Sequence, residues 1–161
     1  MDPDAQSGRE IEPPRGIFAA RVDDKGRLKL PSAVQQYLNS VGDERVFITS
    51  LDTRTARIYP LSVWKQNEKF FEGYTDDPQI AEDIAFIAND LGADSEIDGQ
   101  GRLLVPQELR RTLSIENQPV WLDCYKGRIN VYSKAIYEER KSRAGHGVAE
   151  KLRALERKGL R

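Results

Sequence analysis

The chain contains one cysteine and one histidine among its 161 residues, and this scarcity narrows the chemistry that it can perform. Cys124 alone cannot form an internal disulfide, and together with His146 it cannot complete a Cys/His zinc site. No segment approaches the ~18 consecutive apolar residues of a membrane helix. The N-terminus is acidic and polar, whereas a signal peptide is basic and then apolar. We therefore expect a soluble, cytoplasmic protein that contacts no membrane, holds no metal or cofactor and is not an enzyme.

Charge is unevenly distributed along the chain, although the total is only −1. Residues 65–98 hold 2 basic and 10 acidic side chains, a net charge of −8. Residues 15–64 hold 8 basic and 5 acidic side chains, residues 99–137 hold 6 and 3, and residues 138–161 hold 8 and 4. The pI near 5.9 therefore hides basic segments that could face a polyanion, although a solvated surface of mixed charge would give the same counts.

An internal repeat organises the chain. Residues 23–31, Asp-Asp-Lys-Gly-Arg-Leu-Lys-Leu-Pro, align at an offset of 75 with residues 98–106, Asp-Gly-Gln-Gly-Arg-Leu-Leu-Val-Pro. Asp, Gly, Arg, Leu and Pro coincide, and a leucine lies seven residues after each proline, at Leu38 and Leu113. Further downstream the offset drifts by only two residues. This duplication predicts two similar structural units.

Each copy is predicted to form a strand, a tight turn, a second strand, a short helix and a hairpin. In the Asp-x-x-Gly turn, glycine can adopt positive φ and the aspartate can accept hydrogen bonds from nearby backbone N–H groups. The proline that ends each second strand fits the first turn of a helix. Apolar residues four apart in each helix should face the core: Val34 with Leu38, and Leu109 with Leu113. The hairpins are expected at residues 45–50 with 56–59 and at 119–125 with 128–132.

Two amphipathic helices are predicted between the copies. Residues 64–71 indicate a short helix, and residues 79–91 a longer one with apolar side chains at helical spacing: Ile80, Ile84, Ile87 and Leu91. These helices carry most of the acidic residues, which is typical of a solvated helix face rather than of a carboxylate catalyst. Near the C-terminus, Val148, Leu152 and Leu155 predict either a basic amphipathic helix that grips DNA or a partner, or a frayed end.

The expected fold is a β-rich α+β arrangement in which two units form a pseudo-twofold barrel with short helices after each unit. Each unit spans only ~45 to 50 residues, too few to bury a persuasive core alone, so the two should pack on each other. The expected division is a disordered acidic extension (1–14), a first unit (15–64), an acidic helical spacer (65–93), a second unit (94–137) and a basic tail (138–161).

With both Asp-x-x-Gly-Arg-Leu-x-φ-Pro motifs, the chain resembles the MraZ family of bacterial transcription factors, which are built from two AbrB-type swapped-hairpin units. The resemblance covers residues 15–137 and also includes other short matches: Arg15-Gly16, Ile58-Tyr59-Pro60-Leu61, Asp77-Pro78 and Glu108-Leu109-Arg110. It implies a nucleoid-associated protein that binds short direct repeats in double-stranded DNA upstream of the cell-division and cell-wall gene cluster. It also implies self-association into a ring-shaped homo-oligomer.

The candidate DNA-binding residues lie in and beside the two turns, with one further arginine before the first strand: Arg15, Lys25, Gly26, Arg27, Lys29, Gln100, Gly101 and Arg102. Arginine suits bidentate bonding to guanine or phosphate, lysine acts as a point charge on phosphate, and glutamine can read adenine. Alternatively, Arg27 and Arg102 pair with Asp23 and Asp98 and merely hold the hairpins.

Other interpretations compete with DNA binding. AbrB-type units also occur in antitoxins, which neutralise a toxin through a disordered acidic tail, whereas the tail of this chain is basic. An enzyme lacks support, because Gly99-Gln100-Gly101 is too short for a dinucleotide loop and leads into a strand rather than a helix. The larger aromatic residues are expected in the core rather than on a base-stacking surface: Tyr59, Trp64, Trp121 and Tyr132. Cys124 is expected to be buried, and His146 to lie in an exposed loop.

Overall fold

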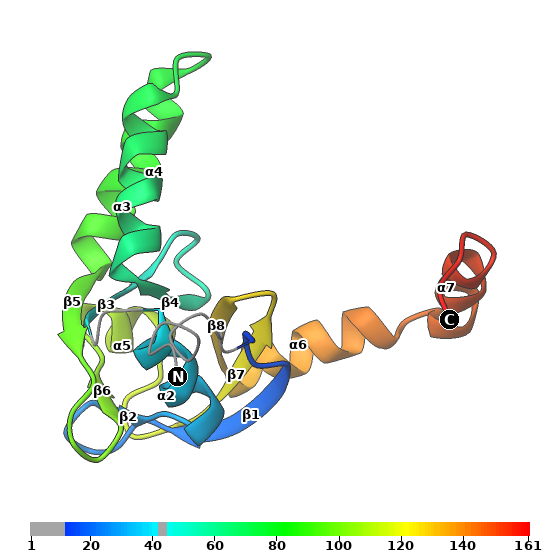
Figure 1. The fold of residues 1–161 in the computed structure, drawn as a ribbon, viewed down its shortest axis with the longest axis horizontal. Coiled ribbons are helices and arrows are strands. Elements are labelled where there is room, and N and C mark those ends of the chain that lie inside the picture. The colour runs from blue at the N-terminus through cyan, green and yellow to red at the C-terminus, as the bar shows by residue number, and fades with distance from the viewer. Residues whose placement is uncertain (1–11, 42–44) are drawn as a thin grey trace, which may run out of the picture.

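The strands of the computed structural model form two sheets (Figure 1), and the structure describes residues 12–41 and 45–161. The strands are β1 (Gly16–Arg21), β2 (Arg27–Lys29), β3 (Arg45–Ser50), β4 (Ala56–Pro60), β5 (Ala93–Glu96), β6 (Arg102–Leu104), β7 (Pro119–Tyr125) and β8 (Arg128–Ser133). The helices in these ranges are α2 (Ser32–Ser40), α3 (Leu61–Gly73), α4 (Pro78–Leu91), α5 (Gln107–Leu113), α6 (Lys134–Gly145) and α7 (Val148–Glu156). The fold is α+β, and the predicted N-terminal extension lies outside the described residues except for its last three.

Both copies show the predicted order of strand, turn, strand, helix and hairpin. The hairpin strands β3, β4, β7 and β8 match the predicted ranges to within one residue. One local detail differs, because Pro31 and Pro106 lie just before the first helical residue rather than within the first turn. Their ψ angles of 148° and 142° are those of extended backbone, so each proline lies between a strand that ended two residues earlier and a helix that begins with the next residue.

The two copies share one sheet. The six-stranded sheet has the order β1-β7-β8-β4-β3-β5. In the repeat, β1 is equivalent to β5, β3 to β7 and β4 to β8, and exchanging these equivalent strands gives the same order read backwards. Thus β1 of the first copy pairs with β7 of the second, and β5 of the second pairs with β3 of the first. Strands β4 and β8 meet at the centre. Neither copy therefore holds its own complete set of strand partners.

The predicted barrel is not closed by backbone pairing within the described residues. Strands β2 and β6, each three residues long, pair with each other and form a separate sheet. Strands β1 and β5 are the two edges of the larger sheet. An isolated bridge between Val22 and Leu28 connects the first strand to the small sheet. The short β2–β6 ladder therefore caps the larger sheet instead of continuing it.

The core lies between the two sheets and draws side chains from both copies. Leu28 and Leu103, which face each other in the β2–β6 ladder, are fully buried. The predicted apolar pairs of α2 and α5 are also buried, which confirms that these helices face the core: Val34, Leu38, Leu109 and Leu113. Each such side chain stabilises the fold by about 1.5–3 kcal/mol relative to an exposed position.

Helices α3 and α4 form a hairpin that projects from the sheet, here called the acidic arm (residues 61–91; Figure 1). Its base is anchored by Trp64, which stacks on Phe47 of β3 at 4.5 Å between ring centroids. Thr49 also donates a hydrogen bond to the carbonyl of Ala88, at 2.7 Å. Ile80, which belongs to the predicted apolar stripe, is 53% exposed, because this stripe continues past the part of α4 that the sheet covers.

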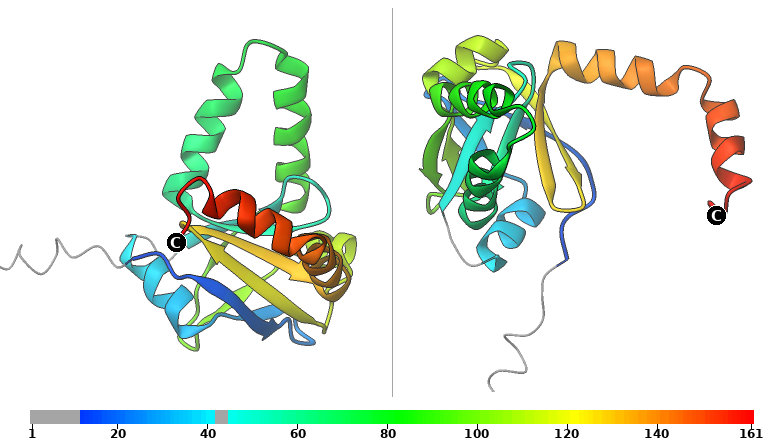
Figure 2. Two further views of the ribbon diagram at one scale, coloured as in Figure 1. Left: turned by 90° about the vertical axis from the view of Figure 1, so that its right-hand side faces the viewer. Right: turned by 90° about the horizontal axis from the view of Figure 1, so that it is seen from above.

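Helices α6 and α7, with the residues that follow them, extend away from the sheets in another direction and are here called the basic arm (residues 134–161; Figures 1 and 2). The start of α6 is fixed by Ser133, whose hydroxyl accepts a hydrogen bond from the N–H of Ile136 at 3.3 Å. Tyr137 stacks on Trp121 at 4.7 Å. The end of the chain is thus helical, and His146 lies exposed between the two helices, as predicted.

The remaining sequence expectations concern buried side chains and membrane helices. Trp64 and Tyr132 are buried in agreement with the prediction, whereas Tyr59 and Trp121 are half-buried. Cys124 is buried, as expected. Among the described residues, no helix combines the length and the apolar content needed to span a membrane.

Candidate nucleic-acid interface

The two duplicated turns flank the β2–β6 ladder. Because these strands are antiparallel, Lys29 lies opposite Arg102, and Arg27 lies opposite Leu104. The arginines that follow the two turns are therefore two ladder positions apart along the strands, about 7 Å at ~3.4 Å per residue. Main-chain bonds connect each turn to the other copy: Leu30 N–H donates to Gly101 and Val105 N–H donates to Gly26, at 2.9 and 2.8 Å.

The first turn is built around the carboxylate of Asp23. One oxygen accepts hydrogen bonds from the backbone N–H groups of Lys25 and Arg27, at 2.9 and 2.8 Å. The other oxygen accepts from Nε of Arg27, at 2.9 Å. Gly26 completes the turn with a φ of 81°, a left-handed conformation that glycine adopts without steric penalty. The aspartate therefore fixes both the backbone of the turn and the side chain of the arginine.

The second turn repeats this geometry. Asp98 accepts from the backbone N–H groups of Gln100 and Arg102, both at 2.9 Å, and its second oxygen accepts from Nε of Arg102 at 2.9 Å. Gly101 has a φ of 76°. The two turns thus present the same arrangement of carboxylate, glycine and guanidinium on neighbouring parts of one surface.

Both turn aspartates stay ionised over a wide pH range. The pKa of Asp23 is lowered chiefly by the hydrogen bond from the backbone N–H of Arg27, and the pKa of Asp98 chiefly by that from Arg102. Partial desolvation opposes this shift in each case. Each carboxylate therefore neutralises its arginine, so that the pair has no net charge.

Arg27 and Arg102 are held through Nε but keep their terminal Nη groups. Their side chains are 31% and 25% exposed. No hydrogen bond from these Nη groups is found within residues 12–41 and 45–161. The ion pair that the sequence offered as an alternative is therefore present, and it leaves donors of the guanidinium for a second acceptor.

The two glycines lie over side chains that sequence reasoning did not select. Gly26 sits on the guanidinium of Arg110 from α5, and Gly101 sits on the amide of Gln35 from α2. A methyl group at either glycine would overlap these atoms. Arg110 donates to the carbonyl of Val105, and Gln35 Nε2 donates to that of Leu30 at 2.6 Å. The repeat offset of 75 relates positions 35 and 110, so the duplication could have identified the pair.

The other predicted site residues are placed differently with respect to the turns. Lys25 is exposed at the first turn, and the exposed Lys29 donates from its ammonium group to the carbonyl of Gln100 in the second. Arg15 lies at the opposite end of β1 and pairs with Glu12 at 3.0 Å. The structure thus brings together every predicted residue of the two turns and their strands, but not Arg15, because the six residues of β1 separate it by roughly 20 Å.

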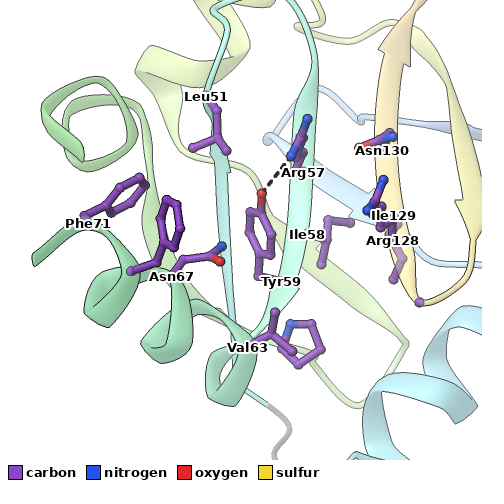
Figure 3. A pocket seen from close by; sticks show the side chains of 13 residues that line it. Leu51, Arg57, Ile58, Tyr59, Val63, Asn67, Phe71, Arg128, Ile129 and Asn130 are labelled. Atoms are coloured by element: carbon purple, nitrogen blue, oxygen red, sulfur yellow. Dashed lines mark hydrogen bonds between the residues drawn. The ribbon is translucent and has the colours of Figure 1, made fainter. Parts of the chain in front are cut away.

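Three other features of the described residues bear on the chemistry of the chain. No group of three or more His, Cys, Asp or Glu side chains there is placed to hold a metal ion. Burial, together with the nearby charge of Asp123, raises the pKa of Cys124 to about 11, so the thiol stays protonated. A cavity of about 470 Å³ between α3, β4 and β8 is lined mainly by apolar side chains, with Arg57 donating to the hydroxyl of Tyr59 at 3.2 Å (Figure 3).

Comparisons with known proteins identify the family of the chain. A family model described as "MraZ protein, putative antitoxin-like" matches residues 92–155. The "Transcriptional regulator MraZ" of Acidobacterium capsulatum is 35% identical over 106 residues, which cover 66% of this chain and 73% of that relative. The relative of the same name in Koribacter versatilis is 30% identical over 105 residues, which cover 65% of this chain and 71% of that relative. The one in Anaeromyxobacter dehalogenans strain 2CP-C is 29% identical over 131 residues, which cover 79% of this chain and 88% of that relative. The chain therefore belongs to the MraZ family.

Proposed function

We propose that this chain is a DNA-binding transcriptional regulator that contacts double-stranded DNA through its two turns. The family consists of transcriptional regulators and not of enzymes. The observation that carries the proposal is the duplicated turn, in which an aspartate holds an arginine through Nε and leaves its Nη groups for another acceptor.

The ion pair prepares each arginine for binding. A free arginine side chain has ~2 kcal/mol of rotamer entropy, part of which is lost when it binds a base or a phosphate. Asp23 and Asp98 already restrict the two guanidiniums in the free protein, so less entropy is lost on binding. The Nη groups can then donate to guanine O6 and N7 or to phosphate oxygens.

The lysines supply the long-range attraction to DNA. Because each arginine is neutralised by its aspartate, the charge that draws in a polyanion comes from Lys25 and Lys29 and is reduced by the exposed Asp24. Gln100 takes the position of Lys25 in the second turn, and its amide can both donate to and accept from adenine. The first turn would therefore contribute more to affinity, and the second more to base recognition.

The finer parts of the proposal rest on the resemblance between this chain and its family. We propose that residues 15–64 and 94–137 act as two AbrB-like units related by a pseudo-twofold axis, with residues 65–93 as the spacer. The operator would consist of short direct repeats upstream of the cell-division and cell-wall genes. Several copies of the chain would engage it as a ring-shaped oligomer in the nucleoid of the cytoplasm.

Selection of bound sequences from random duplex DNA tests the function directly. With the purified full chain, we expect enrichment of a short motif that recurs in the bound molecules. If no motif is enriched, the chain is not a sequence-specific regulator, and an interaction module of the antitoxin kind becomes the better account.

Variants of the first turn test the assigned roles on the selected sequence. Arg27→Ala should weaken specific binding by ~1–3 kcal/mol, which is about 5- to 150-fold, if the guanidinium reads a base. Lys25→Ala should weaken binding to all sequences alike and lower the salt slope by ~1. Arg128→Ala, an exposed arginine beside the β7–β8 turn, is the matched control and should change neither. Normal DNA affinity of folded Arg27→Ala protein would show that this arginine is only structural.

A further inference from the structure

The two projecting arms occupy equivalent positions but carry opposite charge. Helix α3 follows the last strand of the first copy, and α6 follows the last strand of the second. The acidic arm holds 2 basic and 7 acidic residues, a net charge of −5. The basic arm holds 9 basic and 4 acidic residues, a net charge of +5. One end of the molecule therefore attracts the other end of a second copy.

A groove of about 960 Å³ lies between the two helices of the acidic arm and the strands at its base. Its inner lining is aromatic: Trp64 is buried, and Phe71 packs edge-on against it at 6.1 Å. Phe86 of α4 also lines the groove, yet it is 72% exposed. A large aromatic side chain left in water beside an apolar groove marks a surface on which another apolar surface can pack.

The sides of this groove are predominantly acidic. Three glutamates of the arm line it, and Arg45 and Lys65 line it as well. The glutamates are Glu68, Glu72 and Glu82, and no ion pair or hydrogen bond to their side chains is found in the described part of the chain. The groove thus suits an apolar helix face that is flanked by basic side chains.

Helix α7 presents such a face. Val148, Leu152 and Leu155 follow one another at the i, i+4, i+7 spacing of a single stripe and are 58%, 47% and 58% exposed. Basic residues accompany the stripe along α7 and just beyond it: Lys151, Arg153, Arg157 and Lys158. The apolar stripe matches the aromatic lining of the groove, and the basic side chains match its acidic sides.

The helix does not reach the groove of its own chain. Helix α6 leads α7 away from the sheet, and α7 lies apart from the acidic arm in Figure 1 and in the right-hand view of Figure 2. The groove also borders β3 and β5, toward the edge of the sheet opposite β7, against which Tyr137 of α6 packs. The occupant that the chain itself offers is therefore the α7 helix of another copy.

We propose that α7 of one copy docks in the groove of the acidic arm of a second copy, with its apolar stripe on Trp64, Phe71 and Phe86. This contact joins two different surfaces, so it is repeated head to tail and generates a closed ring or an open filament. The inference rests on the self-association included in the proposed function and assigns the surfaces that mediate it.

Two substitutions at exposed positions test the groove and the helix stripe one at a time. Phe86→Asp removes the groove contact and Leu152→Asp removes the helix contact. Each variant alone should associate at least ~10-fold more weakly than the unmodified chain in sedimentation equilibrium, because a buried apolar contact is lost. An equimolar mixture should form a one-to-one dimer that grows no further, since each variant retains the surface that the other lacks. Ile80→Asp and Leu160→Asp, at exposed positions outside the groove and the stripe, are matched controls and should associate normally.

Three outcomes would overturn this inference. They are a monomeric unmodified chain, normal association of either variant, and a mixture that stays monomeric although both variants show unmodified circular dichroism. If Leu152→Asp weakened only DNA binding, α7 would be a DNA contact and the docking would be refuted. DNA affinity for one operator repeat is measured separately, so the absence of a DNA motif would refute the proposed function and leave the association result unaffected.

Discussion

Replacing Gly26 with alanine tests whether the first turn depends on the helix of the other copy beneath it. Gly26 is buried, has a φ of 81° and lies directly over the guanidinium of Arg110. Its conformational freedom and its lack of a side chain are therefore both required. If the turn needed glycine only for positive φ, alanine would cost the strain of the left-handed backbone but would not displace Arg110.

Both effects can be given a magnitude. A left-handed conformation destabilises an L-residue by about 1–2 kcal/mol. The new methyl group would also displace Arg110, whose side chain is only 15% exposed and whose hydrogen bond to Val105 is worth about 1.5–3 kcal/mol for a charged donor. Gly26→Ala should therefore lower the free energy of unfolding by about 2.5–5 kcal/mol. Gly101→Ala should lower it by about 1 kcal/mol less, because Gln35 is a neutral donor.

A double-mutant cycle in urea isolates the contact between the turn and the helix. Arg110→Ala should cost little more in the Gly26→Ala background, because the alanine has already displaced the arginine. The two changes should therefore be non-additive by about 1.5–3 kcal/mol. Unfolding is followed by circular dichroism at one fixed protein concentration and extrapolated linearly to water. Additive losses would refute the assigned contact, even if each single variant were destabilised as expected.

Three further predictions concern pH, the sharing of strands and the operator. Folding lowers the pKa of Asp23 and Asp98, so the stability that these carboxylates give the folded chain should be complete above the ordinary aspartate pKa and should be lost as the pH falls through the lowered values. The urea midpoints of the Asp23→Asn and Asp98→Asn variants should therefore depend less on pH in acid than that of the unmodified chain. A chain ending at Asp94 should not unfold cooperatively on calorimetry, because β1, β2 and β4 lose their partners in the second copy. Inserting ~5 base pairs between operator repeats should weaken binding more than inserting ~10 in a gel-shift titration, whereas equal affinities would contradict binding by linked subunits.

Local structure could be predicted from the sequence because its signals lie within a few residues of each other. Alternating apolar residues and turn residues placed the strands of each hairpin within one residue of their observed ends. The roles of Asp23 and Asp98 in the turns also followed from their spacing to glycine. In each case, the residues that determine the geometry are neighbours in the chain.

Partner choice and burial could not be predicted in the same way. Nothing in the sequence of β1 specifies β7 as its partner, because a half-buried strand fits several neighbours. Ile80 continues the apolar stripe of α4, but the periodicity does not show where the covering sheet ends. Arg15 is close to the first turn in sequence and far from it in space, since an extended strand separates them. The repeat relates Gln35 to Arg110, but their contacts with Gly101 and Gly26 arise only from the packing of the two copies.

The fusion of two copies into one chain lets equivalent positions differ. In a twofold dimer of identical units, both ends would carry the same arm, and two acidic or two basic arms would repel each other. Here the equivalent arms carry −5 and +5, the turns differ at Lys25 and Gln100, and the side chains beneath them differ at Arg110 and Gln35. A one-way, head-to-tail contact requires such a difference between the two ends. The internal duplication therefore supplies the twofold framework of the core, and the divergence of its two halves supplies the polarity that the proposed association needs.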